Sequence, residues 1–195
     1  MSGRLWFVGQ GVERLVGWCG SNRVAWNCLE CTRIGNPDRK PTPREVRCEA
    51  WMSLIHGSRG LIYFVHQFKP NFREAALLDD AQMLEAVTAL NGQITRLAPV
   101  LNSPPLEHAA SVTVSEASAP VSFTVRRHAG KLYLFAVAMR GSATGATFTL
   151  EHVHGPGSVE VIDEGRTVKT QEGRFQDQFE PWQVHLYRVA MPVVE

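Results

Sequence analysis

The sequence predicts a chain of two parts, an α/β part followed by an all-β part. Three observations indicate this division. Segments with helical spacing of apolar residues alternate with short apolar runs over residues 9–97, a proline-rich segment follows at residues 98–105, and short alternating runs separated by Gly, Pro or Asp fill the remainder. We therefore expect two domains, residues 1–102 and residues 106–195.

The α/β part begins with a helix expected at residues 9–19. Val12, Leu15 and Val16 fall at the i, i+3 and i+4 positions of one helical face. Residues 23–30 then predict a buried strand, because they form a mostly apolar, β-favouring run that is too short for a helix.

The next two elements are a capped helix and a continuous apolar strand. Thr42 is typical of an N-cap, Pro43 suits the first helical position, and Glu45 completes a capping box, so a helix is expected from there to about His56. The run Leu61–Val65 has no polar alternation. It predicts a strand that is buried on both faces, as in a parallel sheet.

A third helix is expected at residues 81–97, where apolar residues are spaced by four, three, four and three. The order helix, strand, helix, strand, helix predicts βαβ connectivity with parallel strands. Two strands do not make a stable parallel sheet alone, so further strands are expected from a longer chain or from another subunit.

The second part has the pattern of a small antiparallel β-sandwich. Its alternating runs are short and regularly spaced, which is typical of that architecture. Seven strands are expected, at residues 111–115, 121–127, 131–138, 146–151, 158–162, 167–169 and 183–189.

Composition excludes several classes of function. The 195 residues are 44% hydrophobic and 20% charged, which is typical of a globular protein, and the net charge of +1 argues against a nucleic-acid partner. No apolar run approaches the ~20 residues of a membrane span, so no membrane partner is expected. The composition predicts no compartment.

No metal or cofactor site is expected. Cys28 and Cys31 form a C-x-x-C motif without a second such motif, and residues three apart on a strand face opposite ways, so reduced buried thiols are favoured. His152 and His154 would share a strand face but have no third ligand nearby. Phosphate-loop, nucleophile-elbow and dinucleotide motifs are absent from the sequence.

Glu30 is the most informative polar residue. It ends the first strand and shares one strand face with Trp26 and Cys28. A carboxylate there is either a solvated strand end or a catalytic group. Arg33 is close enough in sequence to help keep Glu30 ionised.

The sequence resembles the C-terminal part of a retaining (β/α)8-barrel glycoside hydrolase of the β-galactosidase-like superfamily, followed by the small β-domain that often trails such barrels. The resemblance covers most of the chain and lies in segments Val24–Glu30, Pro41–Arg47, His56–Phe64, Asn91–Leu101 and Phe175–Tyr187, the last resembling a closing strand. It implies a partial (β/α)8 barrel in which residues 23–30 are the seventh strand and residues 61–65 the eighth.

The resemblance also implies functional residues. The family's nucleophile falls on Glu30, whereas its acid/base group ends the fourth strand, which this sequence lacks. Candidates for lining a sugar site are Trp26, Tyr63, Phe64, His66 and Gln67, because aromatic rings and polar tips suit sugars. For Trp26 the barrel core is the favoured interpretation because it lies early in its strand, whereas His66 is equally explained as a solvated loop residue.

The expected partner is therefore a carbohydrate, with no cofactor, and this chain alone is expected to be inactive. An alternative is a non-catalytic carbohydrate-binding or structural module in which the β-sandwich is the working part. A third possibility is an α/β protein that completes its sheet by self-association through the open barrel edge.

Overall fold

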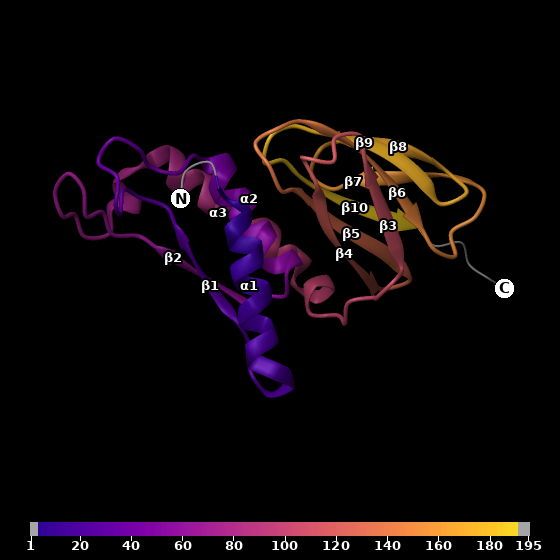
Figure 1. Cartoon of the computed structure of the whole chain (residues 1–195), viewed down its shortest axis with the longest axis horizontal. Helices are drawn as coiled ribbons and strands as arrows, with labels where there is room; N and C mark the ends of the chain where they lie inside the picture. Colours follow the sequence, from indigo (N-terminus) through magenta and orange to yellow (C-terminus); the bar gives the residue numbers. More distant parts are fainter. Residues whose placement is uncertain (1–3, 191–195) are drawn as a thin grey trace. The chain divides into compact units, whose positions relative to one another are not determined.

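The computed structural model describes residues 4–190, apart from the side chains of Ser21 and Ala190. The chain divides into two compact units, Met1–Arg96 and Leu97–Glu195. The first unit contains helices and two strands, and the second consists mostly of antiparallel strands (Figure 1).

The first unit alternates helices with two parallel strands. Its elements are α1 (Trp6–Cys19), the short 3-10 helix η1 (Gly20–Asn22), β1 (Trp26–Glu30), α2 (Pro43–Ile55), β2 (Gly60–Phe64), the 3-10 helix η2 (Ala76–Asp79) and α3 (Ala81–Leu101). β1 and β2 pair in parallel, from Trp26 beside Gly60 to Glu30 beside Phe64. The predicted βαβ connectivity is confirmed.

Helix α2 begins where the sequence predicts. The Thr42 hydroxyl accepts a hydrogen bond from the Glu45 backbone N–H at 3.3 Å, and the Glu45 carboxylate accepts one from the Thr42 N–H at 2.8 Å. Pro43 occupies the first turn, where a missing N–H costs nothing. The chain leaves the helix at Gly57, whose φ of 100° suits glycine.

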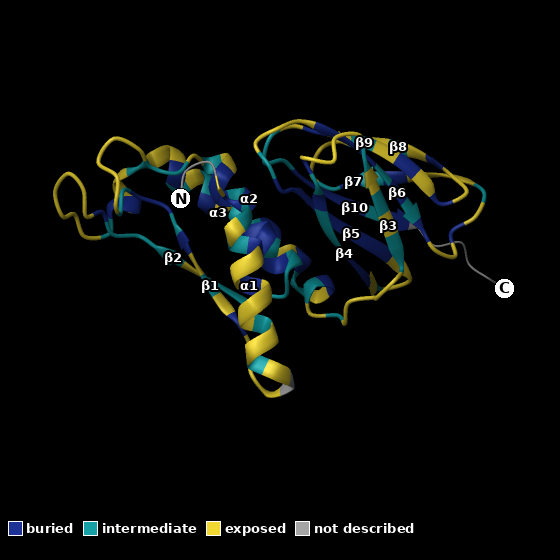
Figure 2. Cartoon of the chain, viewed as in Figure 1, coloured by how far each residue is buried: buried dark blue, intermediate teal, exposed yellow. Residues whose placement is uncertain are grey.

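The two faces of the β1–β2 pair differ in burial. On one face Leu29 is fully buried and the Asn27 amide donates to the Ser53 hydroxyl of α2 at 2.8 Å. On the other face Trp26 is 57% exposed and Ile62 is 49% exposed, and Figure 2 shows exposed residues along β1. The prediction that residues 61–65 are buried on both faces is wrong, because no element of the first unit's described residues covers this second face.

Helix α3 is longer than expected. It buries Met83, Val87 and Leu90, which confirms the predicted apolar stripe, but it continues through Pro99 to Leu101. Residues 98–101 are therefore not linker. A proline in the last turn of a helix removes only one backbone hydrogen bond, so it does not end this one.

The second unit is a nearly closed antiparallel sheet. Its strands lie in the order β3-β6-β9-β8-β7-β10-β5-β4, and β8 and β9 are joined only through the pair of Gln171 and Arg174. The strands are β3 (Ala110–Val114), β4 (Val121–His128), β5 (Lys131–Ala138), β6 (Thr144–Leu150), β7 (Pro156–Val161), β8 (Arg166–Gln171), β9 (Arg174–Phe179) and β10 (Val184–Ala190).

The sheet has eight strands where seven were expected. The segment expected as one closing strand contains two, β9 and β10, which do not pair with each other. Pro181 and Trp182, whose φ is 59°, turn the chain between them. His152 and His154 lie in the connection between β6 and β7, not on a strand face, because β6 ends at Leu150.

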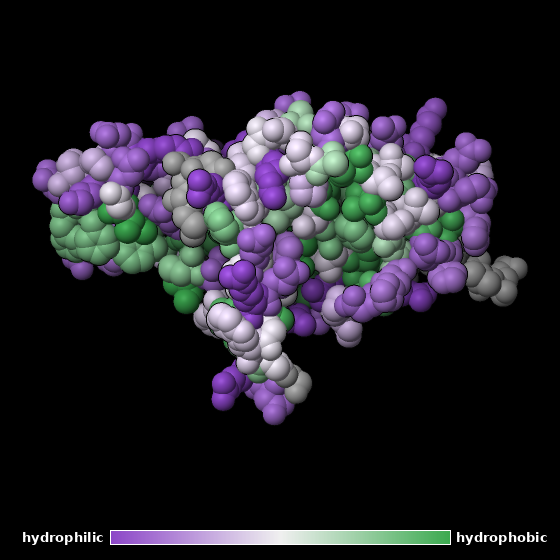
Figure 3. Space-filling model, in the orientation of Figure 1, coloured by the Kyte–Doolittle hydropathy of each residue, from purple (hydrophilic) through white to green (hydrophobic). Residues whose placement is uncertain are grey.

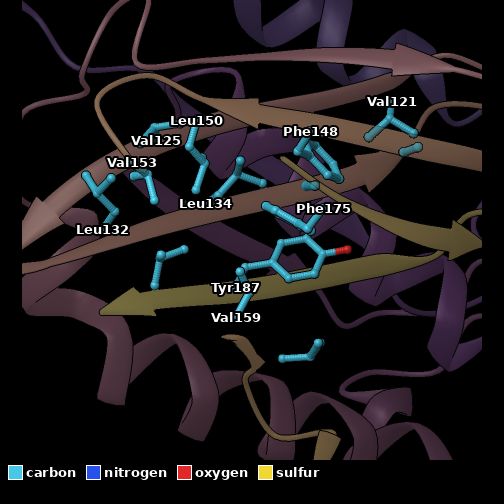
Figure 4. Packing of buried hydrophobic residues seen from close by; sticks show 14 of the residues in the cluster. Val121, Val125, Leu132, Leu134, Phe148, Leu150, Val153, Val159, Phe175 and Tyr187 are labelled. Carbon is cyan, nitrogen blue, oxygen red and sulfur yellow. The ribbon is translucent and has the colours of Figure 1, made fainter. Parts of the chain in front are cut away.

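The core of this unit lies between strands of the curled sheet (Figure 4). The Phe148 ring lies 5.1 Å from that of Phe175 and 5.6 Å from that of Tyr187, measured between centroids. Tyr187 is fully buried, as expected of a packing residue, and its hydroxyl donates to the Asp177 carboxylate at 3.0 Å.

No helix among the described residues is long and apolar enough to cross a membrane. Within residues 4–190, no group of three or more His, Cys, Asp or Glu side chains is placed to hold a metal ion. The four cysteines are free.

Candidate active site

Glu30 is the last residue of β1, at the carboxyl end of the parallel strand pair. Its side chain is half-buried, and one carboxylate oxygen accepts a hydrogen bond from the Ile34 backbone N–H at 3.3 Å. The Cys31 N–H continues the pairing to the Phe64 carbonyl at 3.4 Å. The carboxylate is therefore held at the strand end by its own loop.

Glu30 faces a cavity of about 490 Å³, which we call the Glu30 cavity. Its wall comes from the loop after β1, the first turns of α2 and the residue before α1. The lining residues are Leu5, Glu30, Ile34, Gly35, Asn36, Arg39, Lys40, Pro41, Glu45 and Glu49.

Two further carboxyl groups line the Glu30 cavity and have opposite electrostatic surroundings. Burial disfavours the charge of Glu45, but hydrogen bonds from the Thr42 backbone and from Arg39, at 2.5 Å, outweigh burial and lower its pKa. Burial, with the nearby charge of Glu30 as the second cause, raises the pKa of Glu49 to about 7. The cavity thus combines an ionised carboxylate with a carboxyl group that is about half protonated near neutral pH.

Sequence reasoning missed Glu49 as a site residue and assigned Glu45 only a capping role. The available signal was their spacing of four residues, which places both on one face at the start of α2. That face is directed toward the carboxyl end of β1, where Glu30 lies. The spacing alone does not reveal the direction, because it depends on how α2 packs.

The expected link between Arg33 and Glu30 is not present. Arg33 lines a different cavity with Asp80, whereas Arg39 and Lys40 are the basic residues of the Glu30 cavity. The loop turns back after Thr32, whose hydroxyl donates to the His66 carbonyl at 2.5 Å. This bond directs Arg33 toward the loop after β2.

The loop after β2 carries an aromatic cluster of Phe64, His66, Phe68 and Phe72. The Phe64 ring lies 5.8 Å from the His66 ring and 5.7 Å from the Phe68 ring, and Phe72 lies 6.2 Å from His66, all between centroids. Phe72 is 62% exposed. In Figure 3 apolar atoms gather at the end of the view where Figure 1 draws this loop.

The remaining sequence candidates are distributed over three places. Phe64 and Trp26 lie on the same sheet face as Glu30, with the Trp26 ring over Gly60. Tyr63 lies on the opposite face and donates to the Asn91 side chain of α3 at 2.8 Å, so it does not join them.

The last two candidates lie in the loop after β2. Gln67 is buried and its amide donates to the Asn71 carbonyl at 3.3 Å. The His66 Nδ1 accepts from the Ala75 N–H at 3.1 Å.

Taken together, the carboxyl ends of β1 and β2 carry one carboxylate at a strand end and, on the next loop, exposed aromatic rings. Carboxylates serve as nucleophiles or acid–base groups, and aromatic faces bind the apolar faces of sugars.

Known structures share this fold at low sequence identity. An α-amylase from Geobacillus thermoleovorans, complexed with acarbose, aligns with a TM-score of 0.64 and 8% identity, covering 97% of this chain and 47% of that one. AmyP in complex with maltose aligns with a TM-score of 0.60 and 9% identity, covering 99% of this chain and 46% of that one. A GH30 endoxylanase from Clostridium papyrosolvens aligns with a TM-score of 0.52 and 15% identity, covering 94% of this chain and 46% of that one.

These structural neighbours are glycoside hydrolases, and the chain spans about half of their length. No protein-family model and no curated protein sequence matches the chain.

Proposed function

We propose that this chain forms the C-terminal part of a retaining glycoside hydrolase of the β-galactosidase-like superfamily. β1, α2, β2 and α3 form the last two βα units of a (β/α)8 barrel, and the antiparallel unit is its trailing β-sandwich domain. Glu30 is the nucleophile. The observation that carries this proposal is a carboxylate at the carboxyl end of a parallel strand, on the strand face opposite Asn27 and Leu29, which pack toward α2. Beyond the strand end this carboxylate reaches the cavity that the start of α2 also lines.

This face supports the proposal because barrel enzymes keep helices outside and place catalytic groups at the carboxyl ends of the strands. Leu29 and Asn27 pack toward α2, and Glu30 belongs to the other strand face. The half-length coverage of solved glycoside hydrolases agrees with a chain that supplies only the last part of a barrel.

In the proposed mechanism, the Glu30 carboxylate attacks the anomeric carbon and forms a glycosyl-enzyme intermediate. A second carboxyl group, about 5–5.5 Å away, protonates the leaving oxygen and then activates water. That group belongs to the fourth strand, outside these 195 residues. The hydrogen bond from the Ile34 N–H holds the carboxylate of the nucleophile at the strand end.

The aromatic residues would bind the sugar. Phe64 lies beside Glu30 in the strand register, and His66, Phe68 and Phe72 extend its surface along the loop after β2. Trp26 lies at the opposite end of β1, so it fits the lower layers of a barrel interior better than a sugar site.

The decisive experiment is nucleophile trapping in the enzyme that combines this chain with its remaining strands. A 2-deoxy-2-fluoro glycoside should label the peptide containing Glu30, and Glu30→Gln should remove both labelling and turnover. Glu85→Gln, on the exposed face of α3, is the matched control and should retain both. Labelling of another carboxylate, or normal turnover by Glu30→Gln, would contradict the assignment.

The isolated 195-residue chain should not hydrolyse aryl glycosides, because it lacks the acid. Turnover by the purified chain would contradict the mechanism. Binding of oligosaccharides that Phe72→Ala and Glu30→Gln leave unchanged would instead favour the non-catalytic module, with the antiparallel unit as the binding part.

A further inference from the structure

A second cavity lies between the loops that follow β1 and β2, and its volume is about 300 Å³. It is distinct from the Glu30 cavity, although Lys40 reaches both. Seven polar residues line it: Thr32, Arg33, Lys40, Gln67, Arg73, Asp79 and Asp80. Three basic and two acidic side chains give this cavity an excess of one positive charge.

Backbone hydrogen bonds hold the walls of this cavity in place. The Arg33 carbonyl accepts from the Phe68 N–H at 2.9 Å and from the Lys69 N–H at 3.3 Å. Gln67 and Arg73 exchange both backbone hydrogen bonds, at 3.0 and 2.9 Å. The two loops are therefore joined before any ligand arrives, which reduces the entropy that binding would cost.

Two of the basic side chains already have acidic partners. Arg73 pairs with Asp79 at 2.5 Å, and Lys40 pairs with Asp80. The Lys40 hydrogen bond lowers the pKa of Asp80, and the more distant charge of Arg33 acts in the same direction. Both carboxylates are therefore already engaged by a basic partner.

Arg33 is the exception. It is partly buried, its Nε is buried without a hydrogen-bond partner, and it forms no ion pair in the described part of the chain. A buried guanidinium nitrogen without an acceptor is costly, so an incoming oxygen ligand would recover that energy. Guanidinium groups present paired N–H donors that match carboxylate, phosphate and sulfate oxygens.

The amino-terminal end of α3 adds to the positive charge around this cavity. Ala81, its first residue, lines the cavity, and the Asp80 side chain caps the helix by accepting from the Met83 N–H at 3.2 Å. The amino-terminal end of a 21-residue helix carries partial positive charge. It supports an anion beside Arg33.

We propose that this cavity binds an oxyanion, namely a phosphate, sulfate or carboxylate group, with Arg33 as its principal contact. The cavity, its excess positive charge and the buried Arg33 Nε without a hydrogen-bond partner carry this proposal. The placement agrees with barrels in which loops after the seventh and eighth strands bind phosphate, and that agreement alone depends on the proposed function. If both hold, the enzyme acts on an acidic sugar.

The test is calorimetric titration of the purified chain with inorganic phosphate, sulfate, glucuronate, glucose 6-phosphate and, as the neutral comparison, glucose. We expect saturable binding of at least one oxyanion and none of glucose. Arg33→Met should weaken that binding about tenfold or more, while Arg44→Met, an exposed arginine of α2, should leave it unchanged.

Equal affinity for phosphate and glucose 6-phosphate would identify a site for a free anion. Tighter binding of the sugar ester or of glucuronate would identify an acidic sugar, and each of these results supports the site. Absence of saturable binding by every anion, or unchanged binding in a folded Arg33→Met variant, would overturn it. Because no measurement involves hydrolysis, failure here leaves the nucleophile assignment untouched.

Discussion

The Glu49→Gln substitution should change how the stability of the first unit depends on pH. Burial raises the pKa of Glu49 to about 7 in the folded chain, with the charge of Glu30 as a second cause. The ordinary value is near 4.5. Between these two pH values the folded chain holds a proton that the unfolded chain has released, so stability falls as pH rises and the loss is complete above about pH 7.

The size of this stability loss follows from the difference between the pKa values of Glu49 in the folded and unfolded chains. A difference between 4.5 and about 7 corresponds to a loss on the order of 3 kcal/mol as the pH increases across that window. Glutamine has nearly the same shape and cannot ionise. We therefore expect the variant to lack this loss, and its advantage over the parent chain to grow from near zero at pH 4.5 to about 2–3 kcal/mol at pH 8.

Urea unfolding followed by tryptophan fluorescence measures this difference. Of the five tryptophans only Trp182 lies in the second unit, so the signal reports mainly on the first. The lowered pKa values of the Asp80 and Glu45 carboxyls and of His56 all make stability rise with pH, which is opposite in sign to the Glu49 effect. Comparison with the parent chain at each pH cancels these effects.

A second variant separates the two causes. Glu30→Gln removes the neighbouring charge but not the burial, so the midpoint of Glu49, followed by carbon-13 NMR of its carboxyl group, should fall only part of the way toward 4.5. Parallel stability curves for the parent chain and Glu49→Gln between pH 5 and 8, or a Glu49 midpoint below pH 5, would refute the reasoning.

Three further features, namely a close backbone contact, a core ring and a helix cap, can be tested by urea unfolding. Gly173→Ala should cost on the order of 3 kcal/mol, because φ is +70° and a Cβ would lie 2.6 Å from two backbone carbonyl oxygens, whereas Gly130→Ala, at φ +71° in open space, should cost only about 1 kcal/mol. Equal costs would contradict the close contact. Phe148→Ala, in the core of the antiparallel unit, should cost about 3–5 kcal/mol, and a loss below 1 would mean that the core is not packed as described. Thr42→Ala should cost about 1 kcal/mol through the lost cap, while Thr42→Ser should retain most of it.

Local sequence predicted those elements whose ends are set by neighbouring residues. The capping box fixes the start of α2 through hydrogen bonds between Thr42 and Glu45, and Arg39, another residue close in sequence, donates to Glu45. The strand at residues 131–138 has the predicted bounds, because Gly130 precedes it and apolar residues continue through it. Such features need no knowledge of distant contacts.

Features that depend on distant contacts were missed. Pro99 suggests a linker, but the buried stripe of α3 continues to Val100 and keeps the last turn helical. Glu49 was overlooked because only the packing of α2 beside β1 brings it into the Glu30 cavity. Arg33 was assigned to Glu30 from sequence proximity, whereas the bond from Thr32 to His66 turns the loop the other way.

The exposed face of the β1–β2 pair links the sequence to the proposed function. Trp26 and Ile62 are apolar residues of strands, and parallel sheets are normally covered on both faces. The Trp26 ring covers Gly60 at one end of this face, and Phe64 packs with the aromatic cluster at the other, so Cys28 and Ile62 remain open between them. The residues of this face are apolar, as in a sheet interior, but a sheet of two strands leaves them exposed. Further strands would bury this face. Glu30 ends β1, whose alternate residues form that face, so the strands that complete the sheet would lie beside the strand end that carries its carboxylate. One arrangement therefore accounts for both the exposed apolar face and the proposed chemistry.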